Sequence, residues 1–103
     1  MKGMNDLLRQ AQIMQNKMAK IQEEAGERTV EAQSGGGMVK VICKGKQELV
    51  SINIDKEAVD PDDLEMLEDL VITAVNEALR QARAMMDKEL SAISAGIKMP
   101  GMF

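Results

Sequence analysis

Residues 34–55 read SGGGMVKVICKGKQELVSINID, and this stretch decides the fold. Apolar and polar residues alternate through it, which is typical of β-strands with one buried face. Two residue pairs interrupt the alternation and are predicted to form two-residue hairpin turns, Gly35 with Gly36 and Gly45 with Lys46. With the preceding segment, the pattern predicts three antiparallel strands over about residues 28–34, 38–44 and 47–55.

The predicted turns also predict a register. They place Ala32 and Val30 opposite Val39 and Val41, and the second turn places Val41 opposite Val50. One face of the sheet is then apolar and needs cover by helices; it comprises Val30, Ala32, Val39, Val41, Cys43, Val50, Ile52 and Ile54. On the other face, Lys40 is expected opposite Glu31.

Helical patterns flank the strands. Between residues 3 and 26 apolar residues recur at steps of three and four, forming a heptad seam of Met4, Leu7, Ala11, Met14, Met18, Ile21 and Ala25. Asp60 before Pro61, followed by more acidic residues, indicates the start of a second helix over about residues 61–95. The pattern leaves open whether this helix is continuous, and a loosely ordered tail is expected over residues 97–103.

These elements predict one α+β domain over residues 1–103, a two-layer α-β-β-β-α protomer with a three-stranded antiparallel meander. Strands of six residues span about 20 Å, whereas helices of these lengths span about 35 to 50 Å, so both helices project beyond the sheet. The last strand has no charge between Glu48 and Asp55 and would leave an open edge. A symmetric homodimer would cover both the edge and the projecting seams.

Composition excludes several classes of function. The chain has no His, Trp or Tyr, a single Cys and ten Met, so the commonest general base and metal ligand are absent. We therefore expect no enzyme, no catalytic residue, no metal site, no cofactor and no small-molecule substrate. Cys43 lies among apolar residues, as a buried thiol would. No apolar run suggests a signal peptide or a membrane span, so a cytoplasmic protein without membrane contact is expected.

Three motifs have alternative interpretations. The triplet Gly35–Gly37 is not followed by GKS or GKT and leads into a strand, so a turn is favoured over a phosphate-binding loop. The acidic stretch from Asp60 to Asp69 is interpreted as a solvated helix start rather than a cation site or a nucleic-acid mimic. The methionine-rich seam is interpreted as helix packing rather than a client-binding surface.

Charge is segregated along a chain whose net charge is −4. Residues 1–46 hold eight Lys and Arg against five Asp and Glu, whereas residues 47–77 hold one against ten. The basic residues that could meet phosphates are Lys2, Arg9, Lys17 and Lys20 on the first helix, Arg80 and Arg83 on the second, and Lys44 and Lys46 at a hairpin. Without aromatic residues to stack on bases, the contacts are expected to be electrostatic and mostly to a duplex backbone.

The chain resembles the YbaB/EbfC family of bacterial nucleoid-associated proteins over essentially its whole length. The resemblance rests on the first helix MNDLLRQAQIMQNKMAKIQEE, the block from SGGG to SINID, and a long helix ending near ISAG before a Met/Pro/Gly-rich tail. It implies a cytoplasmic, nucleoid-associated homodimer whose helical arms grip duplex DNA in an architectural or regulatory role. The alternative from another class is a protein-interaction or chaperone-like module with coiled-coil arms and no DNA binding.

Overall fold

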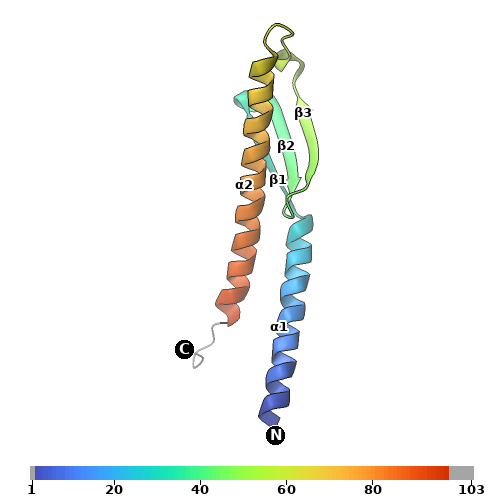
Figure 1. The fold of residues 1–103 in the computed structure, drawn as a ribbon, viewed down its shortest axis with the longest axis vertical. Helices are drawn as coiled ribbons and strands as arrows, with labels where there is room; N and C mark the ends of the chain where they lie inside the picture. The colour runs from blue at the N-terminus through green and yellow to red at the C-terminus, as the bar shows by residue number, and fades with distance from the viewer. Residues whose placement is uncertain (1, 98–103) are drawn as a thin grey trace.

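A computed structural model describes residues 2–97, with the side chains of residues 3–92. In chain order the elements are α1 (Lys2–Glu27), β1 (Thr29–Ser34), the 3-10 turn η1 (Gly35–Gly37), β2 (Val39–Lys44), β3 (Leu49–Ile54), the 3-10 turn η2 (Lys56–Ala58) and α2 (Leu64–Ile97). The three strands form one antiparallel sheet in the order β1-β2-β3. The predicted α+β architecture is confirmed, and α2 is one continuous helix (Figure 1).

The core lies between α2 and the first two strands. Ala74, Ala78 and Ala82 recur at every fourth position of α2 and are fully buried. These small side chains let the helix approach the sheet closely, where they meet the buried side chains of Ala32, Val39, Val41 and Cys43. Ser34 fastens the end of β1 to the helix, because its hydroxyl donates a 2.6 Å hydrogen bond to the carbonyl of Leu70.

The predicted register of the first hairpin was wrong by two residues. Ala32 pairs with Val41 and Val30 with Cys43, because the connection is longer than a two-residue turn. Three successive glycines with positive φ, Gly35 to Gly37, form η1, and Met38 follows before β2 begins. Since the shift is an even number of residues, the apolar face is preserved, but Lys40 lies opposite Gln33 instead of Glu31.

The second hairpin differs from the prediction for a similar reason. The amide of Lys44 donates a 2.8 Å hydrogen bond to the carbonyl of Glu48, so three residues, 45–47, form the loop between this pair. Gln47 adopts the left-handed conformation with φ of 64°. Val41 therefore pairs with Ile52 instead of Val50. An irregularity between Ile42 and Cys43 then brings Leu49, not Val50, opposite Cys43.

The helix start and the tail also differ from the prediction. α2 begins at Leu64, because Asp63 is the capping residue and accepts a 3.2 Å hydrogen bond from the amide of Met66. Asp60 instead closes a turn before the helix, accepting from the amide of Asp62 at 2.9 Å. Ile97 is the last residue of α2, and the rest of the predicted tail, residues 98–103, lies outside the described residues.

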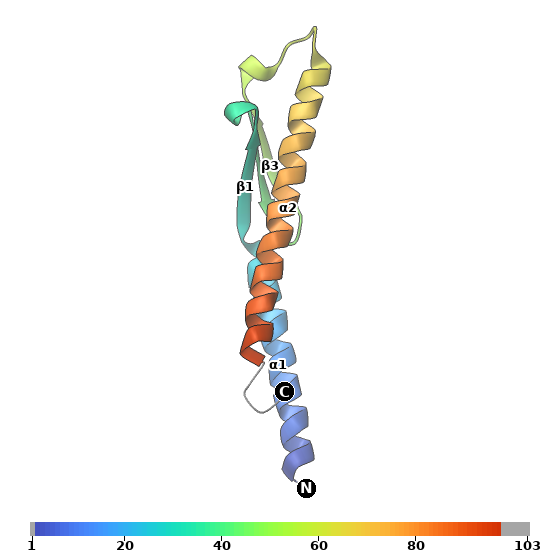
Figure 2. The same cartoon turned by 90° about the vertical axis from the view of Figure 1, so that its left-hand side faces the viewer.

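The tip of the second hairpin holds the C-terminal end of α1. The amide of Lys46 donates to the carbonyl of Gly26 at 3.2 Å, and the amide of Gly45 donates to the carbonyl of Arg28 at 2.8 Å. From this attachment α1 runs away from the sheet, and the C-terminal half of α2 runs beside it (Figures 1 and 2). These two projecting segments, residues 2–20 of α1 and 80–97 of α2, are called the arms below. They extend the molecule to 75 × 22 × 16 Å.

Candidate nucleic-acid interface

The arm of α1 carries cations on the side away from its seam. Met14, Met18 and Ile21 of the seam are partly buried, while Arg9, Lys17 and Lys20 are exposed. At 100° per residue, Arg9 and Lys20 lie within about 20° of each other on the helix surface, and Lys17 lies on the flank. Among the described side chains, these three cations form no ion pair. They are therefore available to phosphates.

The hairpin lysines are engaged by a carboxylate of α1. Glu27 receives the ammonium groups of Lys44 and Lys46, each at 2.9 Å, and Lys46 also contacts Glu48 at 3.3 Å. The hydrogen bond from Lys44, with a second from Lys46, holds the pKa of Glu27 below its usual range. These lysines join the hairpin to α1, and a phosphate would have to compete with Glu27 for them.

The two candidate arginines of α2 are in different situations. The guanidinium of Arg80 donates through Nε to Glu77 at 2.9 Å and also pairs with it through a second nitrogen. This hydrogen bonding from Arg80, aided by Gln81, lowers the pKa of Glu77 from 4.5 to about 2. Arg83 is exposed and has no ion pair among the described side chains, so it is the freer of the two. Lys2 opens α1, and its side chain lies outside those described.

We did not predict one feature of α1, which is that acidic residues are absent between its cations. No Asp or Glu occurs between Asp6 and Glu23, so Arg9, Lys17 and Lys20 share about three helical turns with amides and apolar residues. The exposed side chains Gln10 and Asn16 lie between Arg9 and Lys17 along the chain, and around the helix they flank these cations, Gln10 about 20° from Lys17 and Asn16 about 20° from Arg9. The signal was present in the sequence as the acid-free window from residue 7 to residue 22.

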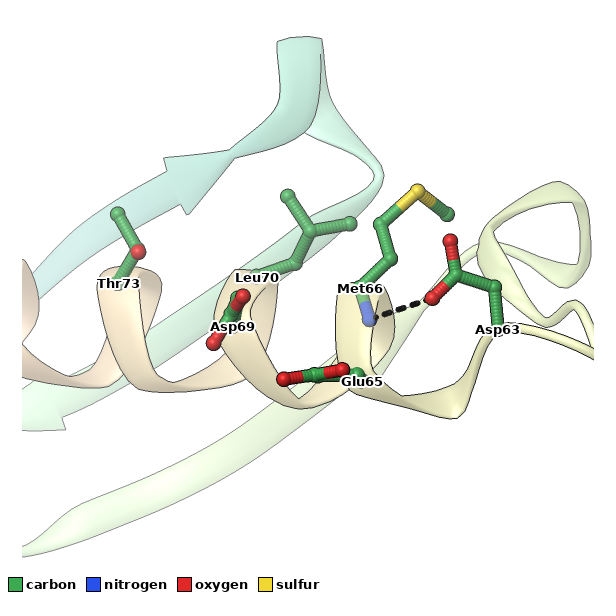
Figure 3. Close-up of a pocket in the computed structure, with 6 residues that line it drawn as sticks. All are labelled: Asp63, Glu65, Met66, Asp69, Leu70 and Thr73. Atoms are coloured by element: carbon green, nitrogen blue, oxygen red, sulfur yellow. Dashed lines mark hydrogen bonds between the residues drawn. The ribbon is translucent and has the colours of Figure 1, made fainter.

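The opposite end of the molecule is acidic. Asp63, Glu65 and Asp69 line a shallow hollow at the start of α2, together with Met66, Leu70 and Thr73 (Figure 3). Lys56 is the only cation between Glu48 and Arg80. Because this end lies far from the arms, its carboxylates do not neutralise the arm cations at the ionic strength of a cell, where the screening length is about 8 Å.

An exposed apolar surface lies beside the core, and we call it the β3–α2 face. In β3, Val50, Ile52 and Ile54 are 53%, 43% and 39% exposed. In α2, Ile72 is 57% exposed. Leu70 lies on the flank of α2 that faces β1, because Ser34 of β1 donates a hydrogen bond to its carbonyl. Ile72 lies on the opposite flank of the helix. The sheet order then places Ile72 on the same side as β3. Leaving these residues in water is costly, because burial of apolar area is worth about 25 cal/mol per Å².

Comparison with known proteins identifies the family of this chain. A sequence model of the YbaB/EbfC DNA-binding family matches residues 1–97. The chain belongs to this family. Among the bacterial relatives, the nucleoid-associated protein of Desulforamulus reducens is 58% identical, covering 98% of this chain and 96% of the relative. The nucleoid-associated protein of Moorella thermoacetica is 54% identical, covering 98% of this chain and 97% of the relative.

The YbaB/EbfC fold is also seen in a solved structure. A crystal structure of an uncharacterized protein from Helicobacter pylori matches with a TM-score of 0.63 and 26% identity, covering 79% of this chain and 93% of that chain. No helix within residues 2–97 has an apolar stretch long enough to cross a membrane. No group of three or more His, Cys, Asp or Glu side chains suited to a metal ion occurs in that part of the chain either.

Proposed function

We propose that this member of the YbaB/EbfC family binds duplex DNA as a homodimer, without catalysis, mainly through phosphate contacts from its arms. The observation that carries the proposal is the acid-free window of α1 with three exposed cations. The spacing of Arg9, Lys17 and Lys20 spreads positive charge over about 16 Å of helix, which matches the length of several phosphates on one DNA strand. Arg83 on the second arm adds a further free charge.

The contact is electrostatic and depends on geometry more than on net charge. The chain is acidic overall, with a net charge of −4, so it would be repelled as a whole by DNA. The arms project away from the acidic end, and screening limits the repulsion to groups within about one Debye length. A duplex is therefore attracted only at the arms.

The β3–α2 face supports a homodimer. Within residues 2–97, β3 is an edge strand whose outer edge presents backbone donors and acceptors beside exposed Ile52 and Ile54. A symmetric partner would cover the edge and these side chains at once. Two copies related in this way bring two pairs of arms to one DNA molecule. The phosphate contacts then double, and the number of contacts sets both affinity and salt dependence.

The role that follows is architectural or regulatory. Contacts to phosphates position a protein on DNA but carry no sequence information directly, so such a protein binds many sites on the chromosome. We infer that the dimer acts on the nucleoid, in the cytoplasm, and the relatives' names, nucleoid-associated protein, support this inference. DNA and a second copy of the chain are its partners.

Charge reversal on α1 tests this proposal. The double variant Arg9→Glu with Lys20→Glu removes two of three window cations per protomer and adds repulsion, so we expect duplex affinity to fall by more than a hundredfold at low salt. The matched control is Lys40→Glu with Lys56→Glu, which changes net charge equally at exposed sites outside the arms. Gel-shift or anisotropy titrations measure both. Equal losses in the two variants would show that net charge, not the α1 arm, determines binding.

A further inference from the structure

One apolar side chain lies in the middle of the basic side of α1. Ile13 is 46% exposed and lies within about 40° of Arg9, Lys17 and Lys20 on the helix surface. The seam residues Met14, Met18 and Ile21 are partly buried on the other side of the helix, so Ile13 takes no part in that packing. Its neighbours one turn away are Arg9, Gln10, Asn16 and Lys17, all of which carry hydrogen-bond donors.

The arrangement of cations around Ile13 suits a helix that lies in a groove of DNA. Arg9 and Lys17 lie one helical turn on either side of Ile13, about 12 Å apart along the helix axis. The major groove of B-DNA is about 12 Å wide and admits an α-helix, whereas the minor groove, about 6 Å wide, is too narrow for one. An α-helix is about 10 to 12 Å across, so α1 fits when it lies along the groove. Arg9 and Lys17 lie about 40° to either side of Ile13 around the helix, so they then face the phosphates of opposite strands while Ile13 faces the floor of the major groove.

The floor of the major groove offers one apolar group. Thymine presents its C5-methyl there, while the other base edges present hydrogen-bond donors and acceptors. We propose that α1 enters the major groove and that Ile13 packs against a thymine methyl, with the amides of Gln10 and Asn16 beside it. This inference rests on the proposed function and adds a direct contact with bases to its phosphate contacts. It makes Ile13 a residue that determines sequence preference.

The test compares two duplexes of equal length and charge, one containing thymine and the other uracil at every thymine position. Uracil lacks only the C5-methyl, so binding by the natural chain should weaken about fourfold per contacted methyl, the value expected for burying one methyl group. The variant Ile13→Ala should bind the two duplexes equally. Its salt dependence should stay unchanged, because no charge is removed. Leu8→Ala is the matched control, since Leu8 is 63% exposed and lies about 140° from Ile13 around the same helix.

The outcomes separate the two proposals. Discrimination by the natural chain and by Leu8→Ala, together with its loss in Ile13→Ala, supports the inference. If the natural chain, Leu8→Ala and Ile13→Ala all bind in a salt-dependent way and show the same ratio of affinities for the thymine and uracil duplexes, the inference is overturned and the proposed function stays intact. A changed oligomeric state of Ile13→Ala in sedimentation would assign Ile13 to a protein contact and would overturn it as well. Absence of salt-dependent binding by the natural chain would overturn both proposals.

Discussion

Gly45 is where the hairpin meets the end of α1. A Cβ at this position would collide with the carbonyl oxygen of Ala25 and would come within 2.7 Å of the methyl group of Met85. The collision with backbone cannot be relieved by a rotamer change, so Gly45→Ala should lower the free energy of unfolding by about 2 to 3 kcal/mol. Urea unfolding at a fixed protein concentration measures it. The control Gly3→Ala adds a methyl group into open space and should be neutral or slightly stabilising.

Glu77 restrains Arg80, and its removal should release this arginine to DNA. In Glu77→Gln the carboxylate that binds the guanidinium is lost, so duplex affinity should rise several-fold. Glu68→Gln removes a charge from the same helix, from a carboxylate with no ion pair among the described side chains, and controls for the change in net charge. Equal gains in the two variants would show that Arg80 is not a DNA contact.

The same ion pair predicts a pH dependence of stability. Folding lowers the pKa of Glu77 from 4.5 to about 2, chiefly through Arg80, so the pair stabilises the folded state above pH 4.5. This contribution is lost as the pH falls from about 4.5 to about 2, where the carboxylate takes up its proton. The stability difference between the natural chain and Glu77→Gln should therefore shrink across that window. Urea unfolding at several pH values measures it, and a difference independent of pH would contradict the assignment.

At the scale of elements, the β3–α2 face decides whether the chain associates. Ile52→Glu with Ile72→Glu introduces charges into the proposed interface, and desolvating them would cost more than the dimer gains. We expect a monomer at micromolar concentration in sedimentation equilibrium. The control is Thr73→Glu. Thr73 lies on the other flank of α2, in the hollow of Figure 3, so a charge there should leave the association of two chains unchanged. A dimer that survives the double change would place the interface elsewhere.

The elements themselves could be predicted from periodicity, whereas their register could not. The alternation of apolar residues from Val39 to Ile54 indicated strands and their buried face, but it is equally satisfied by shifts of two residues. The lengths of the glycine turn and of the loop at Gln47 choose between these shifts. The start of α2 was ambiguous for a related reason, because Asp60 and Asp63 are both suitable caps.

The candidate site was predictable only in part. The cations of the α1 arm and their exposure follow from the helical pattern of residues 3–26. The pairing of Arg80 with Glu77 is local, at a spacing of three residues, and could have been found in the sequence. The binding of Lys44 and Lys46 by Glu27 could not, because it depends on how the second hairpin packs against the end of α1.

At the scale of the whole molecule, acidic and basic residues are separated along a length of 75 Å. The acidic end and the basic arms act independently only if the contact with DNA is local to the arms. We therefore expect the arms to neutralise a few phosphates of the duplex, although the chain has a net charge of −4. This number of phosphates can be measured.

The most direct test is duplex binding by the purified natural chain across a series of salt concentrations. A dimer presenting Arg9, Lys17 and Lys20 twice contacts about four to six phosphates, so a plot of log affinity against log salt should be linear with a slope of roughly −4 to −5. An affinity that does not change between low and physiological salt, or no binding at low salt, would contradict the account.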